Sequence, residues 1–411
     1  MPLSRRQIYR RRRIVVFGSL ALVLAVGFYL PATLLAPLEA TAASVPAVTV
    51  KPAKAAAIPY PSYGASAVTA VGYEGSLSSA GSTKPLPMAS ISKIITTLVV
   101  LEKKPLAVGE DGPTITMDAS DVAWYHHYLS MGGSVQGVRA GEKLTELQLL
   151  EVTLIPSANN YAASMVDWAF GSVDAFVPVA QKWLADHGLD DTTFIEPTGI
   201  DAKNASTALD LVHLGELALQ SPVLAKVVGM TTATIPDVGV VKTTNKLLGI
   251  DGVTGLKTGT LGPNEANLLF SATHKVGSTT VTIVGVVLGG FDNTTIDKDI
   301  RTMLQGVYAG FHTVTLTSKG AVFGSYSTPW GQSTSIVSAS GSSVVVWGDT
   351  AVTAKVTADP VRTGPAGQSV GSVVYTVGDP QQKATSVSVN LVLKTAITDP
   401  GAGWRLTHPF G

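Results

Sequence analysis

The segment Pro-Met-Ala-Ser-Ile-Ser-Lys, residues 87–93, leads into the apolar run Ile94–Leu101. This pattern predicts a helix on which Ser90 and Lys93, three residues apart, share one face. The first turn of a helix has free N–H groups and a positive dipole end. That end, with burial and a second cation, would lower the pKa of the lysine and let it take the serine proton. An N-cap serine with a solvated lysine is the alternative, because Ser-x-x-Lys alone is a common pattern.

A second candidate motif is the triplet Ser157-Ala158-Asn159, which directly follows Pro156. The proline should end or kink the helix predicted over 144–168, so the triplet is expected in a tight connection. It offers a hydroxyl for proton relay and an amide that both donates and accepts hydrogen bonds. A helix cap is the alternative reading, and residues 388–390 carry an equally good match in a strand-like run.

A third candidate motif is Lys257-Thr258-Gly259 with Thr260. It predicts a short strand whose edge carries a charge and a hydroxyl, with glycine leaving room for an extended peptide. The backbone N–H of Thr260 could face an oxyanion. An ordinary strand between turns is the alternative, and residues 362–364 form a near match.

The three triplets are separated by 67 and 100 residues along the chain. In this order they resemble the motifs of penicillin-recognising serine enzymes. The chain resembles the D-alanyl-D-alanine carboxypeptidases, the low-molecular-mass penicillin-binding proteins, over roughly residues 62–311. Five collinear blocks carry the resemblance: 87–93, 141–159, 194–199, 244–248 and 252–260. It implies an α/β (α+β) catalytic domain of the serine β-lactamase/DD-peptidase type with an antiparallel central sheet.

The resemblance implies four catalytic positions. Ser90 would be the acylated nucleophile and Lys93 its general base. Ser157 would relay a proton towards the leaving amine, and Asn159 would hold Lys93 and the substrate amide.

The resemblance also implies four substrate-binding positions, Lys257, Thr258, Gly259 and Thr260. Lys257 would stabilise charge, and Thr258 would bind the terminal carboxylate of the substrate. The N–H groups of Ser90 and Thr260 would form an oxyanion hole. Neither a metal nor a cofactor is implied.

The chain departs from the resembled family at three places. Many members have an arginine just after the central strand that helps to bind a free carboxylate, whereas residues 289–294 contain none and the nearest is Arg301. Asn160 follows the second triplet, where an aspartate is common. Many members are anchored by a C-terminal amphipathic helix, whereas residues 407–411 indicate none, so we expect anchoring through the N-terminus.

The N-terminal residues predict export. The first 13 residues hold six arginines and no acid, and residues 14–36 have no charged side chain. Such a stretch is long enough to span a bilayer, and basic residues on one flank place that flank in the cytoplasm. We therefore expect a single-pass anchor with the rest of the chain outside the cell membrane. Secretion after cleavage near Ala40-Thr41-Ala42 is the alternative.

Composition excludes several classes of protein. Charged residues make up 14% and hydrophobic residues 45% of the 411 residues, which excludes a disordered chain. Without the six arginines, 23 basic residues face 29 acidic ones, so the remainder carries −6 and does not favour nucleic acid. The absence of cysteine excludes disulfides, thiolate metal sites and cysteine nucleophiles.

The chain is expected to have five parts: a basic segment 1–13, an anchor 14–36, a linker 37–61, a catalytic domain 62–311 and a β-rich domain 312–411. Helices are predicted over 94–101, 144–168 with a break near Pro156, 172–187, 208–219 and 296–311. A buried central strand is predicted over 279–288. Strands are predicted in the C-terminal part over 321–326, 342–347, 352–358, 370–377 and 386–393.

We therefore predict a serine-type D-Ala-D-Ala carboxypeptidase that trims peptidoglycan stem peptides through an acyl-enzyme on Ser90. β-Lactam antibiotics would be its inhibitors, the membrane would be bound through the N-terminal helix, and nucleic acid would not be a partner. An endopeptidase that cuts cross-links, or a non-catalytic penicillin-binding or wall-binding module, is the alternative.

Overall fold

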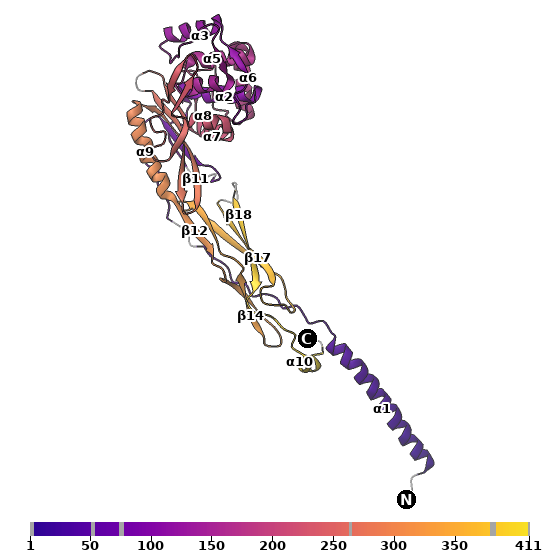
Figure 1. Cartoon of the computed structure of the whole chain (residues 1–411). Coiled ribbons are helices and arrows are strands. Elements are labelled where there is room, and N and C mark those ends of the chain that lie inside the picture. The colour runs from indigo at the N-terminus through magenta and orange to yellow at the C-terminus, as the bar shows by residue number, and fades with distance from the viewer. Residues whose placement is uncertain (1–3, 51–53, 74–77, 263–264, 379–383, 410–411) are drawn as a thin grey trace. The chain divides into compact units, whose positions relative to one another are not determined.

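The computed structural model describes residues 4–50, 54–73, 78–262, 265–378 and 384–409 (Figure 1). These residues form two compact units. The larger unit comprises Ala53–Thr313 with Val345–Thr350, and the β-rich unit comprises Met1–Pro52, Val314–Val344 and Ala351–Gly411.

An antiparallel five-stranded sheet forms the centre of the larger unit, in the order β2-β1-β11-β10-β9. Its strands are β1 (Ala65–Ala70), β2 (Ser79–Gly81), β9 (Val253–Thr260), β10 (Ala266–Val276) and β11 (Thr279–Gly290). The antiparallel central sheet agrees with the predicted fold class. The sheet leaves β9, which carries the Lys-Thr-Gly triplet, as an edge strand.

Helices pack on both faces of this sheet. One face is covered by α7 (Ala208–Gln220), and the other by α9 (Asn293–Gly310). The central strand β11 serves both layers, because Val284, Val286 and Leu288 join one hydrophobic cluster and Ile283 and Val287 the other. Such two-sided burial accounts for the uninterrupted apolar run in its sequence.

The remaining helices of the larger unit extend the α7 layer. They are the 3-10 turn η1 (Ala89–Ile91), α2 (Ser92–Lys103), α3 (Ala119–Ser130), α4 (Glu146–Leu154), α5 (Asn159–Phe170), α6 (Val173–Asp186) and α8 (Pro222–Val228). Three short strand pairs complete the unit: β3 (Leu86–Pro87) with β6 (Ala205–Ser206), β4 (Thr114–Thr116) with β5 (Lys143–Thr145), and β7 (Thr232–Ile235) with β8 (Gly239–Lys242).

The β-rich unit contains a second antiparallel sheet in the order β13-β14-β18-β17-β16. Its strands are β13 (Val322–Ser327), β14 (Ser333–Ser338), β16 (Val352–Ala358), β17 (Ser369–Val377) and β18 (Thr385–Leu393). Strands β12 (Phe311–Thr317) and β15 (Ser342–Trp347) pair with each other, and each has only part of its residues in the β-rich unit, while α10 (Ala402–Thr407) lies near the C-terminus. The sequence pattern does not predict two of these strands, β12 and β14.

The N-terminal helix α1 (Arg5–Leu34) is 30 residues long and contains an 18-residue window of mean hydropathy 2.3. It is long and apolar enough to cross a membrane. The stretch 37–61, predicted as a linker, makes isolated antiparallel bridges within the β-rich unit from Thr41 to Val361 and from Ser44 to Ser325. Its mixed Ala, Pro and Val composition gives no sign of this pairing.

Candidate active site

The nucleophile segment bends sharply just before α2. Ala89 has a positive φ of 50°, and Ser90 lies in the 3-10 turn η1 that leads into the helix. Lys93 follows in the first turn of α2, and its Nζ donates a 2.9 Å hydrogen bond to Ser90 Oγ. The hydroxyl of a partly exposed serine therefore lies within direct reach of a lysine amine.

Lys93 is fully buried, and its amine donates two further hydrogen bonds, to Asn159 Oδ1 at 2.6 Å and to the Thr198 carbonyl at 2.8 Å. Burial lowers the pKa of this amine well below its usual range, and repulsion from Lys257 lowers it further, while Glu196 acts in the opposite direction. A lysine whose pKa is lowered in this way gives up its proton more readily than a free lysine, and its neutral amine can accept the proton of Ser90.

The connection between α4 and α5 holds the second triplet. Ser157 has a positive φ of 66° and is 5% exposed, and Asn159 begins α5 with its backbone N–H bonded to the Ser134 carbonyl at 2.8 Å. The break predicted at Pro156 is present as the gap between these helices. No hydrogen bond joins the Ser157 hydroxyl to any residue that the structure describes.

The third triplet lies along edge strand β9. Lys257 is 1% exposed, its Nζ lies 3.1 Å from the Thr258 carbonyl, and burial lowers its pKa to about 7. The Thr258 hydroxyl lies 2.5 Å from that of Thr244, while Thr260 is exposed. An edge strand with unpaired backbone groups can take an extended peptide as an added strand.

Gly259 brings this strand against the nucleophile segment. A Cβ at residue 259 would lie 2.7 Å from the Met88 carbonyl oxygen and 3.3 Å from Ser90 N. The structure thus places Ser90, Lys93, Asn159 and the 257–260 strand together. Within the described part of the chain, neither the Ser157 hydroxyl nor the Thr260 hydroxyl forms a hydrogen bond with Ser90, Lys93 or Asn159.

Residues 194–199 support the site, although their sequence assigns them no role. The turn that contains Pro197, Thr198 and Gly199 packs on the face of α2 that carries Lys93. Besides the bond from Lys93, the Thr96 hydroxyl donates to the Pro197 carbonyl at 2.7 Å. In the sequence, the glutamate before Pro-Thr-Gly and the asparagine at 204 are the signal that could have identified this support.

The departure at Asn160 has a structural reason. This fully buried side chain accepts from Gln136 N at 3.1 Å and donates to Gln136 O at 3.0 Å, as a paired strand would. An aspartate has no donor for the carbonyl when it is ionised. The asparagine therefore suits the loop before α4 better than a carboxylate would.

We expect Asn160→Asp to lower the free energy of unfolding by about 1–3 kcal/mol, because the half-buried Gln136 carbonyl loses its donor and a carboxylate takes the place of a fully buried amide. The loss should shrink at acidic pH, where a protonated carboxyl donates again. Chemical denaturation measures it, with Asn390→Asp on the exposed side of β18 as the matched control. Equal losses in both variants would contradict the role of the Gln136 contact.

The nearest arginine to the end of β11 is engaged elsewhere. Arg301 Nε donates to Asp251 Oδ2 at 2.6 Å, and Asp251 lies just before the start of β9. Thr258 lies near the other end of that strand, roughly 20 Å away at about 3.3 Å per residue. Arg301 therefore does not supply a guanidinium beside the Lys-Thr-Gly triplet.

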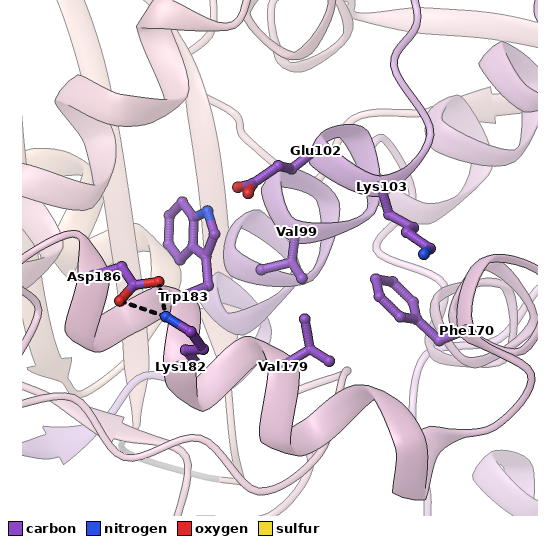
Figure 2. Close-up of a pocket in the computed structure, with 8 residues that line it drawn as sticks. All are labelled: Val99, Glu102, Lys103, Phe170, Val179, Lys182, Trp183 and Asp186. Carbon is purple, nitrogen blue, oxygen red and sulfur yellow. Dashed lines mark hydrogen bonds and ion pairs between the residues drawn. The ribbon is translucent and has the colours of Figure 1, made fainter.

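A separate pocket of about 250 Å³ lies towards the far end of α2, and its lining residues are drawn in Figure 2. A hydrogen-bonded pair, Lys182 and Asp186, stands at its edge at 2.5–2.8 Å. Its lining residues are Val99, Glu102, Lys103, Phe170, Val179, Lys182, Trp183 and Asp186. None of the site residues described above belongs to it.

Comparison with known proteins gives one family and several related structures. A profile described as D-alanyl-D-alanine carboxypeptidase matches residues 66–292. The chain is 28% identical over 238 residues to the D-alanyl-D-alanine carboxypeptidase DacF of Bacillus subtilis, covering 56% of this chain and 58% of that protein. It is 33% identical over 141 residues to a D-alanyl-D-alanine endopeptidase of Pseudomonas aeruginosa, covering 34% and 42%. The chain thus spans about half the length of these curated relatives.

Solved structures with the same fold include a peptidoglycan synthesis regulatory factor (PBP3) from Streptococcus pneumoniae, with a TM-score of 0.59 and 19% identity over 83% of this chain and 100% of that one. Penicillin binding protein 5 from Haemophilus influenzae has a TM-score of 0.57 and 19% identity over 86% and 100%. At these identities the likeness concerns the fold.

Proposed function

The chain belongs to the D-alanyl-D-alanine carboxypeptidase family, and on this premise we propose that it trims peptidoglycan stem peptides through an acyl-enzyme on Ser90. The observation that carries the proposal is the 2.9 Å contact between the buried Lys93 amine and the Ser90 hydroxyl. A serine beside a lysine of lowered pKa is an activated nucleophile.

In the proposed reaction, Lys93 takes the proton of Ser90 while Ser90 Oγ attacks the carbonyl carbon of the penultimate D-alanine. The N–H groups of Ser90 and Thr260 receive the oxyanion that forms. As the peptide bond breaks, the proton taken up by Lys93 is passed through the Ser157 hydroxyl to the nitrogen of the leaving D-alanine, which returns the Lys93 amine to its neutral form. Water then hydrolyses the ester on Ser90, and the stem peptide leaves one residue shorter.

The remaining side chains orient the substrate in this proposal. Asn159 holds Lys93 through its Oδ1, and its amide N–H group is left to bind the substrate backbone. Lys257 supplies positive charge, and Thr258 binds the terminal carboxylate from the edge strand β9. Gly259 keeps this strand close to the nucleophile segment. β-Lactams would acylate Ser90 in place of the peptide.

The proposed location is the cell membrane, with the larger unit on the outer side. Support comes from α1, which is long and apolar enough for a span and has six arginines before its apolar part. Basic residues on that flank favour a cytoplasmic N-terminus. Secretion after cleavage beyond α1 is the alternative.

A second candidate function is the hydrolysis of cross-links by the same acyl-enzyme. It is favoured by the engagement of Arg301 with Asp251, which takes this arginine away from Thr258 and from a free carboxylate bound there. The endopeptidase relative of Pseudomonas aeruginosa supports the same candidate. The acyl-transfer chemistry on Ser90 is identical in both functions.

The decisive experiment incubates the full chain in detergent with a fluorescent penicillin, a pentapeptide ending in D-Ala-D-Ala, and a cross-linked peptide dimer. We expect covalent labelling of the wild type and release of D-alanine, and loss of both in Ser90→Ala. Faster cleavage of the dimer than of the pentapeptide would select the endopeptidase. Equal labelling of the wild type and Ser90→Ala would contradict the assignment of the nucleophile.

A further inference from the structure

The carboxylate of Glu196 organises the turn that follows it. Glu196 Oε2 accepts from Thr198 N at 2.8 Å and from Thr198 Oγ1 at 2.7 Å, while Oε1 accepts from Gly199 N at 2.5 Å. Asn204 Nδ2 and Asp201 N add two longer hydrogen bonds to Oε1, at 3.2 and 3.5 Å. A carboxylate that accepts this many hydrogen bonds from one short turn holds the backbone of the turn in place, and so fixes the direction of the backbone carbonyl groups in the turn.

Those carbonyl groups point at α2. The Thr198 carbonyl accepts from Lys93 Nζ, and the Pro197 carbonyl accepts from the buried Thr96 hydroxyl. Asn204 links the same turn to the start of the helix, because its Nδ2 bonds both the Glu196 carbonyl at 2.7 Å and Ser92 Oγ at 3.1 Å. Glu196 is thus separated from the Lys93 amine by a single residue, Thr198.

Glu196 is also the anion that acts on this amine. Lys257, from β9, repels the Lys93 cation, and Glu196 attracts it. Tyr128, from α3, also lies by Glu196, but burial raises the pKa of its phenol and keeps it neutral. The contacting side chains of Ser90 and Asn159 carry no charge.

We propose that Glu196 is a positioning residue for the general base, acting on Lys93 in two ways. Through the Thr198 carbonyl it fixes where the amine points, and through its charge it offsets the repulsion by Lys257. The inference rests on the proposed function, because it concerns the base of that reaction. Among the described residues, no hydrogen bond joins the Glu196 carboxylate to Ser90 or to β9, so we infer that Glu196 acts through Lys93.

The sign of the expected effect follows from the charge. A neutral residue at position 196 removes an attraction for the lysine cation, so the Lys93 pKa falls further. The amine then becomes neutral at lower pH, and the acidic limb of the acylation rate moves to lower pH. The maximal rate should also fall, by up to about 100-fold, because the amine is held less well.

The test measures the second-order rate constant for acylation of Ser90 by a fluorescent penicillin across pH, in the full chain. Glu196→Gln removes the charge, and Glu196→Asp keeps it on a shorter side chain. Glu102→Gln makes the same change at the exposed far end of α2 and is the matched control. We expect the acidic limb of the pH–rate profile to lie at lower pH in Glu196→Gln than in wild type. In Glu196→Asp and in Glu102→Gln it should lie at the wild-type pH. Profiles of wild type and Glu196→Gln that coincide would overturn the inference.

A second readout does not need catalysis. The pKa of Lys93 is lowered in the folded state, so the unfolded chain binds more protons and stability rises with pH from the folded pKa up to the unfolded one. In Glu196→Gln this rise should begin at lower pH than in wild type. If Ser90 is not labelled in any variant, the proposed function fails, while a shifted or unshifted stability curve still decides whether Glu196 controls Lys93.

Discussion

Replacing Lys93 with methionine is expected to slow acylation of Ser90 by about 10²- to 10⁴-fold, the usual contribution of general acid–base catalysis. Methionine fills a similar volume but has no basic nitrogen. The Lys93 amine is the one lysine nitrogen within hydrogen-bond distance of Ser90 Oγ among the described residues. Without it, the serine hydroxyl keeps its proton at neutral pH and attacks poorly.

The measurement is the second-order rate constant for labelling by a fluorescent penicillin at pH 7–8. Lys298→Met on the exposed side of α9 is the matched control, since it makes the same change away from the site. A Lys93→Met variant that acylates within tenfold of the wild-type rate would contradict the assignment of the base. Ser157, which is buried and lies two residues before Asn159 in the sequence, would then be the next candidate for proton transfer.

Stability gives an independent check on the same variant. Wild type has two buried lysines of lowered pKa, Lys93 and Lys257, and each binds a proton on unfolding. Each therefore makes stability rise with pH, by up to about 1.4 kcal/mol per unit, between its folded pKa and that of a free lysine. Lys93→Met removes one of these two contributions. A pH series of denaturation curves should show a shallower rise in the variant.

The local parts of this site were predictable because short-range geometry determines them. A spacing of three residues along continuous helical chain, here the 3-10 turn η1 followed by α2, puts Ser90 and Lys93 on one face. Pro156 separates α4 from α5 for an equally local reason, and the apolar run 279–288 could only be a strand buried on both sides or a buried helix. β-Branched residues favoured the strand, and β11 confirms it.

The support behind Lys93 was not predictable in this way. The Thr198 carbonyl that accepts from Lys93 lies 105 residues further along the chain, and the Pro197 carbonyl that accepts from Thr96 lies 101 residues away. Backbone carbonyls carry no residue identity, so no motif indicates them. Only the packing on α2 of the turn that contains Pro197, Thr198 and Gly199 brings these groups together.

In the β-rich unit, the sequence predicts only some of the strands, and for a different reason. The sequence does not indicate strand β14, because residues 333–338 are half serine and only Ile336 and Val337 indicate burial. The sequence predicts the end of α9 one residue late, because Phe311 continues the apolar pattern of the helix. In the structure, Phe311 is the first residue of β12. In both cases pairing with a neighbouring strand decides the structure over local preference.

Replacing Gly199 with alanine is expected to reduce acylation of Ser90 by about 100-fold, although residue 199 carries no reactive group. Gly199 has a φ of +81°, and a Cβ there would lie 1.8 Å from the Ala89 carbonyl oxygen and 2.9 Å from Ser90 N. Either the 197–201 turn or the nucleophile segment must move to relieve such an overlap. Any such movement separates Lys93 from the Thr198 carbonyl or rotates Ser90 away from Lys93.

The cost of the positive φ must be separated from the cost of this overlap. Gly171, at the C-terminal cap of α5, has a similar φ of +86°, but no atom lies within 4 Å of the place that a Cβ would take. Gly171→Ala therefore carries only the conformational cost of about 1–2 kcal/mol. We expect both variants to unfold at lower temperature, and Gly199→Ala alone to lose acylation. If Gly199→Ala acylates as fast as Gly171→Ala, the close contact between the turn and Ala89 is not needed for the reactive geometry. Labelling rates at a temperature where both variants remain folded decide between these outcomes.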